Sequence, residues 1–314
     1  MNNNERKIVR KINNVEFISR EKCIINSNHK LNHIRTVESI DGEYGKFDIL
    51  FCEECGIGYT SPFPSPETVA ELYNDRSQSL NFTGGEGGTD EKDIMSSIKR
   101  YLAKKSVDAL IKQHISPKNL LDFGCGNGSF ALIAHQTYAN LDVTALDFHE
   151  QAPAQLDGTR VSYMSYDNFN RSEIKYDIIH LRAVLEHVHE PIRFLAMLRS
   201  HLNQNGIIYI YVPRPFNTWA KIWGKFSDYS YYTPFHITHF TPKGLVNLIN
   251  LAGLYGTPYN IELPLTSNFL EKLFDTRLSN TLRIIGALFF PLHLIVNKVA
   301  NNSNHLGCIA RVIR

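Results

Sequence analysis

The chain has 314 residues, of which 43% are hydrophobic and 20% charged, and its formal net charge is +2 at pH 7. This length and composition are those of a globular protein with one large domain or two smaller ones. The lysines and arginines are scattered along the chain, which argues against a nucleic-acid-binding protein, because such proteins gather basic residues on one face.

The N-terminal residues, MNNNERKIVRKINN, have no apolar stretch behind their basic residues. They do not predict a secretory signal, and we therefore expect a cytoplasmic location. Further along, the apolar run IIGALFFPLHLIV at 284–296 contains a proline and a histidine and is shorter than a membrane span. This pattern favours buried helices over a membrane anchor.

Cysteines predict a metal site within the first 60 residues. Cys52 and Cys55 form a Cys-x-x-Cys pair, and Cys23 precedes them, with His29 and His33 in between. In a cytoplasmic chain this spacing favours a metal over a disulfide, and structural zinc prefers a closed tetrahedral set of sulfur and nitrogen ligands. We expect zinc on Cys23, His29, Cys52 and Cys55, with His33 as an alternative fourth ligand. The competing interpretation is three free thiols.

The remaining pattern suggests two domains. Residues 1 to about 60 are polar and irregular apart from an apolar patch at 47–51, so we expect a small N-terminal zinc-binding module at 1–75 and a glycine-rich linker or lid at 76–93. From residue 94 to 314 helices alternate with short apolar strands, which predicts an α/β fold with a doubly wound, mostly parallel sheet. We expect helices at 94–113, 129–138, 191–202 and 242–253, strands at 119–124, 141–147, 160–165, 176–182, 206–213, 257–263 and 307–314, and a helical insertion at about 265–304.

The stretch LLDFGCGNGSF at 120–130 places Asp122 at the end of a strand and glycine at 124, 126 and 128. A phosphate-binding P-loop would continue with Gly-Lys-Ser or Gly-Lys-Thr, which is not found here. A dinucleotide-binding loop separates its last two glycines by two residues, whereas this chain separates them by one. Asp122 would also be placed better beside a cation than beside a pyrophosphate.

The pattern Asp-x-Gly-x-Gly-x-Gly, with Asp147 closing the next strand, resembles the class I S-adenosylmethionine-dependent methyltransferases. The resemblance implies a seven-stranded Rossmann-like sheet and S-adenosylmethionine as the cofactor. It also implies that the glycine loop passes under the methionine portion and the ribose, that Asp147 binds the ribose hydroxyls, and that Phe148 packs on the adenine. The cofactor-binding residues it implies are Asp122, Gly124, Cys125, Gly126, Asp147, Phe148, Ser165, Tyr166, Leu181 and Arg182.

Three histidines are candidates for catalysis. Methyl transfer from a sulfonium is an in-line displacement, so a base is needed only where the acceptor must lose a proton. The segment PFHITHF resembles the histidine-containing signature of ubiquinone-type O-methyltransferases and deoxysugar C-methyltransferases. This resemblance implies His236 as the first choice for a general base and His239 as the second, and His187 is a third candidate. For each of them, a helix cap or a hydrogen bond in the core is the competing interpretation.

The acceptor is expected to be a small molecule. Aromatic residues are dense between 214 and 234 and suit a sugar or a flat ring. The cysteine pattern and the following GYTSPFPSPETVAELY resemble the N-terminal zinc module of deoxysugar C-methyltransferases, although Asn26 stands where those relatives have a second cysteine. We therefore expect methylation of a sugar or nucleotide-linked sugar in polysaccharide or secondary-metabolite biosynthesis. A hydroxyl is favoured over a carbon, because the match to the longer C-methylating enzymes is incomplete.

Two other functions compete with this interpretation. A quinone or lipid O-methyltransferase would turn residues 284–296 toward a membrane. A non-catalytic scaffold would hold the cofactor without transferring its methyl group. An RNA methyltransferase is disfavoured, because the chain shows no concentration of basic residues.

Overall fold

A seven-stranded sheet forms the centre of this computed structural model, which describes residues 8–73, 107–112, 114, 116–217, 230–261, 303 and 305–313. Its strands are β7 (Asn119–Phe123), β8 (Asp142–Asp147), β9 (Ser162–Ser165), β10 (Tyr176–Arg182), β11 (Leu202–Pro213), β13 (Leu254–Ile261) and β14 (His305–Val312). They lie in the order β13-β14-β11-β10-β7-β8-β9; β14 pairs antiparallel with β11 and β13, and the other pairs are parallel. The predicted fold class, a mostly parallel α/β sheet, is confirmed.

Helices cover both faces of this sheet because successive side chains of a strand point to opposite faces. Leu120 of β7 packs in one core together with residues of α3, and Leu121 packs in the other core together with residues of α5 and α7. In β10, Ile178 likewise packs in the core that contains α3, and Ile179 packs in the core that contains α5 and α7. The helices that lie wholly within the described part of this domain are α3 (Ser129–Thr137), α4 (Tyr166–Asn170), α5 (Pro191–Ser200) and α7 (Pro242–Leu251), with short 3-10 turns η1 (Ala154–Leu156) and η2 (Leu185–His187).

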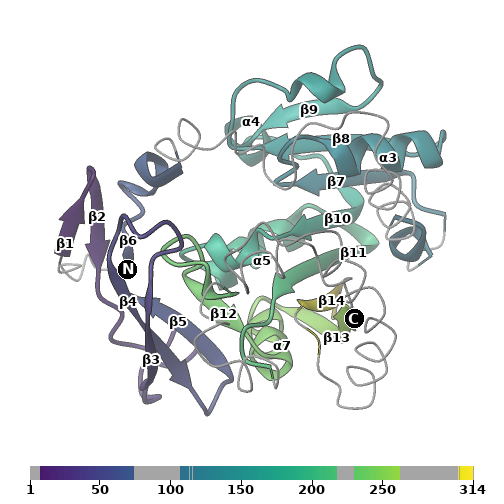
Figure 1. Cartoon of the computed structure of the whole chain (residues 1–314). Coiled ribbons are helices and arrows are strands. Elements are labelled where there is room, and N and C mark those ends of the chain that lie inside the picture. Colours follow the sequence, from purple (N-terminus) through teal and green to yellow (C-terminus); the bar gives the residue numbers. More distant parts are fainter. Residues whose placement is uncertain are drawn as a thin grey trace, which may run out of the picture.

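Residues 8–64 contain the strands β1 to β6, and the expectation of an irregular segment up to about residue 60 was wrong. A three-stranded sheet consists of β1 (Ile8–Ile12), β2 (Val15–Ile18) and β6 (Phe63–Pro64). A four-stranded antiparallel sheet consists of β3 (Asn32–Glu38), β4 (Lys46–Cys52), β5 (Ile57–Ser61) and β12 (Thr238–Phe240). In Figure 1 these N-terminal strands, in purple, lie beside β12 and at one side of the large sheet. β3 and β4 bury only some of their residues, and glycine, threonine and serine interrupt the buried β5, so the sequence of this sheet carries a weak apolar signal.

Several expected boundaries differ from the structure. β11 begins four residues before the predicted start, because the polar residues Asn203–Asn205 are part of the strand. β13 begins three residues before its predicted start. Within the expected helix at 94–113, residues 107–111 are helical and the part before 107 lies outside the described residues. The expected linker at 76–93 and the insertion at 265–304, with its apolar run at 284–296, also lie outside the described residues, and the domain boundaries stay predictions. Among the described helices, none has the length and apolar character needed to cross a membrane.

Candidate active site

The candidate site lies at the carboxyl ends of β7 and β10, where the strand order reverses. From β7 the chain continues outward to β8 and β9, whereas β10 and β11 lie on the other side of β7 (Figure 1). In open α/β sheets, ligands bind in the crevice at such a switch point. The glycine loop follows β7 and the turn η2 follows β10 after a short connection, so the fold brings two predicted motifs to one edge of the sheet.

The loop after β7 has the backbone that its glycines allow. Gly124, Gly126 and Gly128 have φ values of 73°, 54° and 79°, in the left-handed region that favours glycine. The backbone N–H of Gly126 donates to Asp147 Oδ2 at 2.9 Å, and those of Gly124 and Cys125 donate to the carbonyl oxygen of the residue before Asp147. Asp147, predicted to hold the ribose, therefore also orders the loop.

A buried carboxylate and histidine lie directly below this loop. Asp122 Oδ1 lies 2.8 Å from His180 Nδ1, on the neighbouring strand, and the two side chains are each 4% exposed. Phe130 of α3 stacks on the His180 ring with centroids 3.7 Å apart. Within the part of the chain that the structure describes, Asp122 Oδ2 has no hydrogen-bond partner. Sequence reasoning missed His180, although a histidine inside the apolar strand YDIIHL is itself a signal.

The remaining predicted cofactor residues surround the ends of β8, β9 and β10. Phe148 is 63% exposed, and its ring centroid lies 4.9 Å from that of Tyr166. Ser165 is buried, and its hydroxyl has no hydrogen-bond partner among the described residues. Leu181 is buried at the end of β10, and the exposed Arg182 follows it. The exposed Phe148 and the half-buried Tyr166, beside the ends of β8 and β9, could hold a flat ring.

Two predicted catalytic histidines lie together. The His187 and His236 rings meet edge to face, with centroids 4.8 Å apart. His187 Nδ1 lies 2.9 Å from the Phe235 carbonyl oxygen and 3.0 Å from the Tyr73 hydroxyl. A carbonyl oxygen can only accept, so Nδ1 carries the ring proton and Nε2 the lone pair. Burial lowers the pKa of His187 to about 4, so its ring is neutral at pH 7. Glu186, which the sequence analysis did not assign, completes this cluster.

His239 occupies a different environment. It is 2% exposed in β12, and its Nε2 lies 2.9 Å from Thr60 Oγ1 on β5. The same hydroxyl donates to the His236 carbonyl oxygen at 2.7 Å. Burial lowers the pKa of His239 to about 3. This arrangement matches the interpretation of His239 as a hydrogen-bonded core residue, and its role in catalysis stays a prediction.

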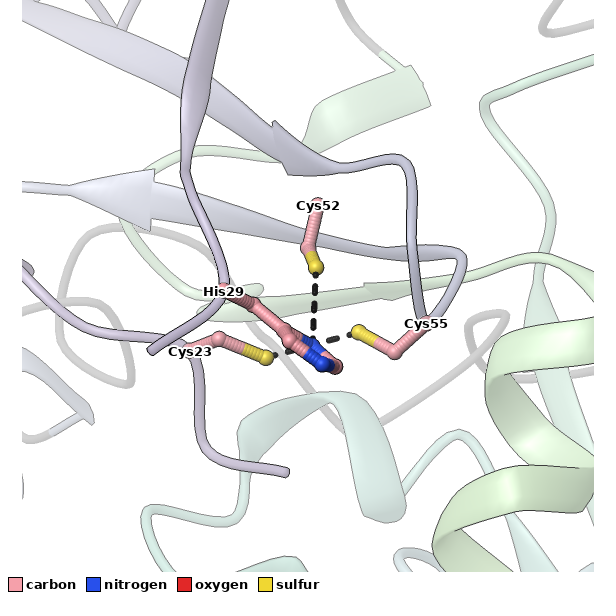
Figure 2. Close-up of side chains that lie close together, drawn as sticks. All are labelled: Cys23, His29, Cys52 and Cys55. Atoms are coloured by element: carbon pink, nitrogen blue, oxygen red, sulfur yellow. Dashed lines mark hydrogen bonds between the residues drawn. The ribbon is translucent and has the colours of Figure 1, made fainter. Parts of the chain in front are cut away.

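The predicted metal ligands converge on one point at the N-terminal sheet. Figure 2 shows the three thiols and the imidazole directed toward one another. Cys23 Sγ lies 3.4 Å from Cys55 Sγ, Cys52 Sγ lies 3.5 Å from His29 Nδ1, and all four ligand atoms lie within 4.8 Å of one another. His33, the alternative ligand, instead contacts Asp48 Oδ1 at 3.2 Å and is exposed.

The surroundings of this cluster suit a structural metal. His29 Nε2 lies 3.4 Å from Glu54 Oε2, and metal-bound histidines commonly hold their second nitrogen against a carboxylate in this way. The three thiols are buried. Three sulfurs and one nitrogen are a donor set typical of zinc. The Cys55 carbonyl oxygen also accepts from Asn247 Nδ2 at 3.1 Å, which joins the cluster to α7.

Comparison with solved structures returns methyltransferases at low identity. A Burkholderia thailandensis 1,6-didemethyltoxoflavin N1-methyltransferase, bound to its substrate and S-adenosylhomocysteine, is 17% identical with a TM-score of 0.49, over 85% of this chain and 96% of that one. A SAM-dependent methyltransferase from Archaeoglobus fulgidus is 16% identical with a TM-score of 0.46, over 70% of this chain and 100% of that one.

Curated relatives match over a limited part of the sequence. A malonyl-[acyl-carrier protein] O-methyltransferase of Anoxybacillus flavithermus is 27% identical over 110 residues, 33% of this chain and 42% of the relative. A ubiquinone biosynthesis O-methyltransferase of Histophilus somni is 28% identical over 126 residues, 34% of this chain and 50% of the relative. The chain thus spans about half the length of the curated relatives it matches.

The family comparison covers the region that contains the glycine loop, the turn η2 and the histidine segment. A family model described as a methyltransferase domain matches residues 95–258, just over half of the chain. The chain therefore belongs to the methyltransferase-domain family.

Proposed function

We propose that the protein transfers a methyl group from S-adenosylmethionine to a small molecule. The observation that carries this proposal is the loop of Gly124, Gly126 and Gly128, which is tied to Asp147 at the switch point of the sheet. Such a loop lets the backbone approach a ligand closely, and it follows a buried carboxylate instead of a phosphate-binding sequence. S-adenosylmethionine, when bound, supplies an electrophilic methyl group on a sulfonium.

The described residues fit this cofactor. Asp122 Oδ2, buried and without a hydrogen-bond partner among the described residues, would accept from the ammonium group of the methionine portion. Asp147, at the end of β8, would accept from the ribose hydroxyls while it continues to hold the Gly126 N–H. Phe148 and Tyr166 would pack against the adenine. In this arrangement the residues at the end of β10 would lie beside the methyl group that is transferred.

For the acceptor, we propose a sugar or nucleotide-linked sugar with a hydroxyl as the methylated group, in polysaccharide or secondary-metabolite biosynthesis. His236 would serve as the base that takes the hydroxyl proton, with His187 in contact with it. Tyr232 packs against His236 with centroids 4.8 Å apart, and such aromatic walls suit sugar rings. Both curated relatives are named as O-methyltransferases, which supports oxygen as the acceptor atom. Trp219, Trp223, Phe226 and Tyr229, also expected in this wall, lie outside the described residues.

We further propose that Cys23, His29, Cys52 and Cys55 hold a structural zinc ion. The support is their convergence, their donor set and the carboxylate behind His29. With four protein ligands the site is closed, so the metal would stabilise the fold and take no part in methyl transfer.

Native mass spectrometry with and without S-adenosylhomocysteine tests the cofactor and the metal together. One zinc ion and one nucleoside per chain are expected. An absence of nucleoside binding would overturn the methyltransferase proposal, whereas binding without zinc would overturn the metal assignment alone.

Variants then test the division of roles. Asp147→Ala should weaken binding of S-adenosylhomocysteine at least about 10-fold, because charge-assisted hydrogen bonds contribute about 1.5–3 kcal/mol. Asp142→Ala, at the exposed start of the same strand, is the matched control and should bind normally. His236→Ala should retain binding and lose turnover in a screen of sugar nucleotides. Equal loss of binding in Asp147→Ala and His236→Ala would contradict this division.

A further inference from the structure

Glu186 is a buried carboxylate to which the proposed function assigns no role. It is the second residue of η2, next to the end of β10, and is 1% exposed. Neither of its carboxylate oxygens has a hydrogen-bond partner in the described part of the chain. A desolvated carboxylate is unfavourable unless it is protonated or paired with a positive charge. Its position therefore requires a proton or a cation nearby.

His236 is the basic group beside it. His236 Nε2 lies 3.9 Å from Glu186 Oε1, which is within ion-pair distance but too long for a hydrogen bond. The backbone fixes this approach, because the N–H of Ile237 donates to the Glu186 carbonyl oxygen at 2.9 Å. Thr60 holds the His236 carbonyl oxygen from the other side. These main-chain hydrogen bonds therefore keep the Glu186 and His236 side chains close to each other.

We propose that Glu186 and His236 form a proton-sharing pair in which Glu186 is the positioning residue for the catalytic base. The inference rests on the proposed methyl transfer to a hydroxyl group. As the acceptor oxygen forms its bond to the methyl carbon, the sulfur–carbon bond breaks and its electron pair stays on sulfur. The hydroxyl proton passes to the His236 ring, and the Glu186 carboxylate stabilises the imidazolium that results.

The environment of the pair predicts its pH dependence. Burial raises the pKa of Glu186 from 4.5 to about 8. Below about pH 8 the pair therefore already holds a proton and cannot take one from the acceptor. Above about pH 8 the pair has lost this proton and can accept one, so turnover should rise as the pH increases through 8. The elements packed around Glu186 carry these titratable or charged groups: Arg182 at the end of β10, His187 of η2, Tyr209 and Tyr211 of β11, and His239 of β12. His236 lies beside Glu186, and Tyr73 and Tyr232 contact His187 and His236 respectively. His187 and His239 have pKa values of about 4 and 3, well below this range, and burial raises the pKa of Tyr211 above it.

A metal ion is the competing occupant of this cluster, because the ligand atoms of Glu186, His187 and His236 lie within 4.8 Å of one another. A proton cancels the single negative charge of Glu186. A divalent ion would instead leave net positive charge beside the proposed sulfonium, which is itself a cation. The charge balance therefore favours the proton.

The pair can be tested without knowing the acceptor, by NMR of the histidine ring nitrogens in the full chain labelled with ¹⁵N-histidine. We expect the His236 signal, assigned by its loss in His236→Ala, to shift in one step near pH 8 in the wild type. The step should vanish in Glu186→Gln and persist in Glu190→Gln, whose carboxyl group is 55% exposed and lies four residues away. Absence of the step in the wild type, or its persistence in Glu186→Gln, would overturn the pair.

Two further measurements complete the test. Glu186→Gln should bind S-adenosylhomocysteine as the wild type does, which shows that it is folded; if it fails to fold, Glu186→Asp should retain a titration step at a displaced pH. A second metal ion in native mass spectra that disappears in Glu186→Gln would overturn the proposal in favour of a cation site. With an acceptor in hand, Glu186→Gln should lower kcat about 100-fold with little change in KM, and Glu186→Asp should restore part of it. The NMR step does not require turnover, so failure of the pair is distinguishable from failure of the proposed function.

Discussion

Gly124 shows how the absence of a side chain permits the glycine loop to approach η2. A Cβ atom at this position would lie 2.5 Å from Val184 Cγ2, closer than such atoms can pack. Its φ of 73° is also unfavourable for any other residue. The loop after β7 and the segment after β10 therefore come together only because residue 124 has no side chain.

Gly124→Ala should destabilise the protein and weaken cofactor binding. We expect a loss of about 2–4 kcal/mol in the free energy of unfolding, which combines left-handed backbone strain with overpacking against Val184. Gly158→Ala is the matched control, because Gly158 has a φ of 70° and nothing within 4 Å of an added Cβ; it should lose about 1–2 kcal/mol. Urea unfolding monitored by circular dichroism measures both, and equal losses would contradict a clash with Val184.

At the scale of elements, the pairing of β12 with β5 joins the histidine segment to the N-terminal sheet. Thr238, His239 and Phe240 pair with residues 57–59 of β5. Thr60 extends the contact, since its N–H donates to the Ile237 carbonyl oxygen and its hydroxyl contacts both His236 and His239. The segment that carries the proposed base is therefore held in place by the N-terminal sheet.

Thr60→Val tests this connection. Removal of the hydroxyl leaves the buried His239 Nε2 without its partner on β5, and an unsatisfied buried group costs about 1–3 kcal/mol. We expect a loss of that size in stability, reduced turnover, and unchanged affinity for S-adenosylhomocysteine, because the glycine loop is not touched. Thr36→Val, which removes an exposed hydroxyl from β3 of the same sheet, should change neither stability nor turnover appreciably. Reduced affinity for the nucleoside would argue against a local effect.

The elements also show what the sequence could predict. The parallel strands were predictable because they are buried on both faces and appear as continuous apolar runs such as IIYIYV at 207–212. The N-terminal strands were not predictable from the sequence, because polar residues interrupt their apolar residues. In addition, β5 pairs with β12, which lies about 180 residues later in the chain. In the site, Asp122 and the glycines follow a recognisable spacing. His180 stands out in its apolar strand, but its contact with Asp122 depends on the register of β7 and β10. The burial of Glu186 is defined only in the folded chain.

At the scale of the whole molecule, the cysteine cluster belongs to the main core. Cys23, Cys52 and Cys55 pack in the same apolar cluster as Leu245 and Leu248 of α7 and the inner residues of β10 and β11. Gly56 lies so close to α7 that an added Cβ would lie 2.6 Å from Thr241 Oγ1. Loss of the proposed metal would therefore disturb the N-terminal end of α7 as well as the N-terminal sheet.

Metal removal should affect stability and turnover more than cofactor binding. Treatment with a chelator, or Cys52→Ser, should lower Tm by at least about 5 °C, because a structural metal contributes directly to folding free energy. Turnover should fall with it, whereas S-adenosylhomocysteine should still bind at the glycine loop after β7, which contains none of the four ligands. Cys308→Ser changes a buried thiol of β14 outside the cluster and should keep its zinc content. Retention of Tm after complete zinc loss would contradict a structural metal.

The pairing of β5 with β12 also has a consequence for biosynthesis. β5 leaves the ribosome long before residues 238–240 are made, so its outer edge has no strand to pair with during much of translation. Unpaired edges of this kind are sites where chains associate wrongly. A nascent chain that stalls before residue 238 would therefore expose a nearly complete sheet with one open side. Slowed synthesis between residues 61 and 238 should raise aggregation more than slowed synthesis after residue 240.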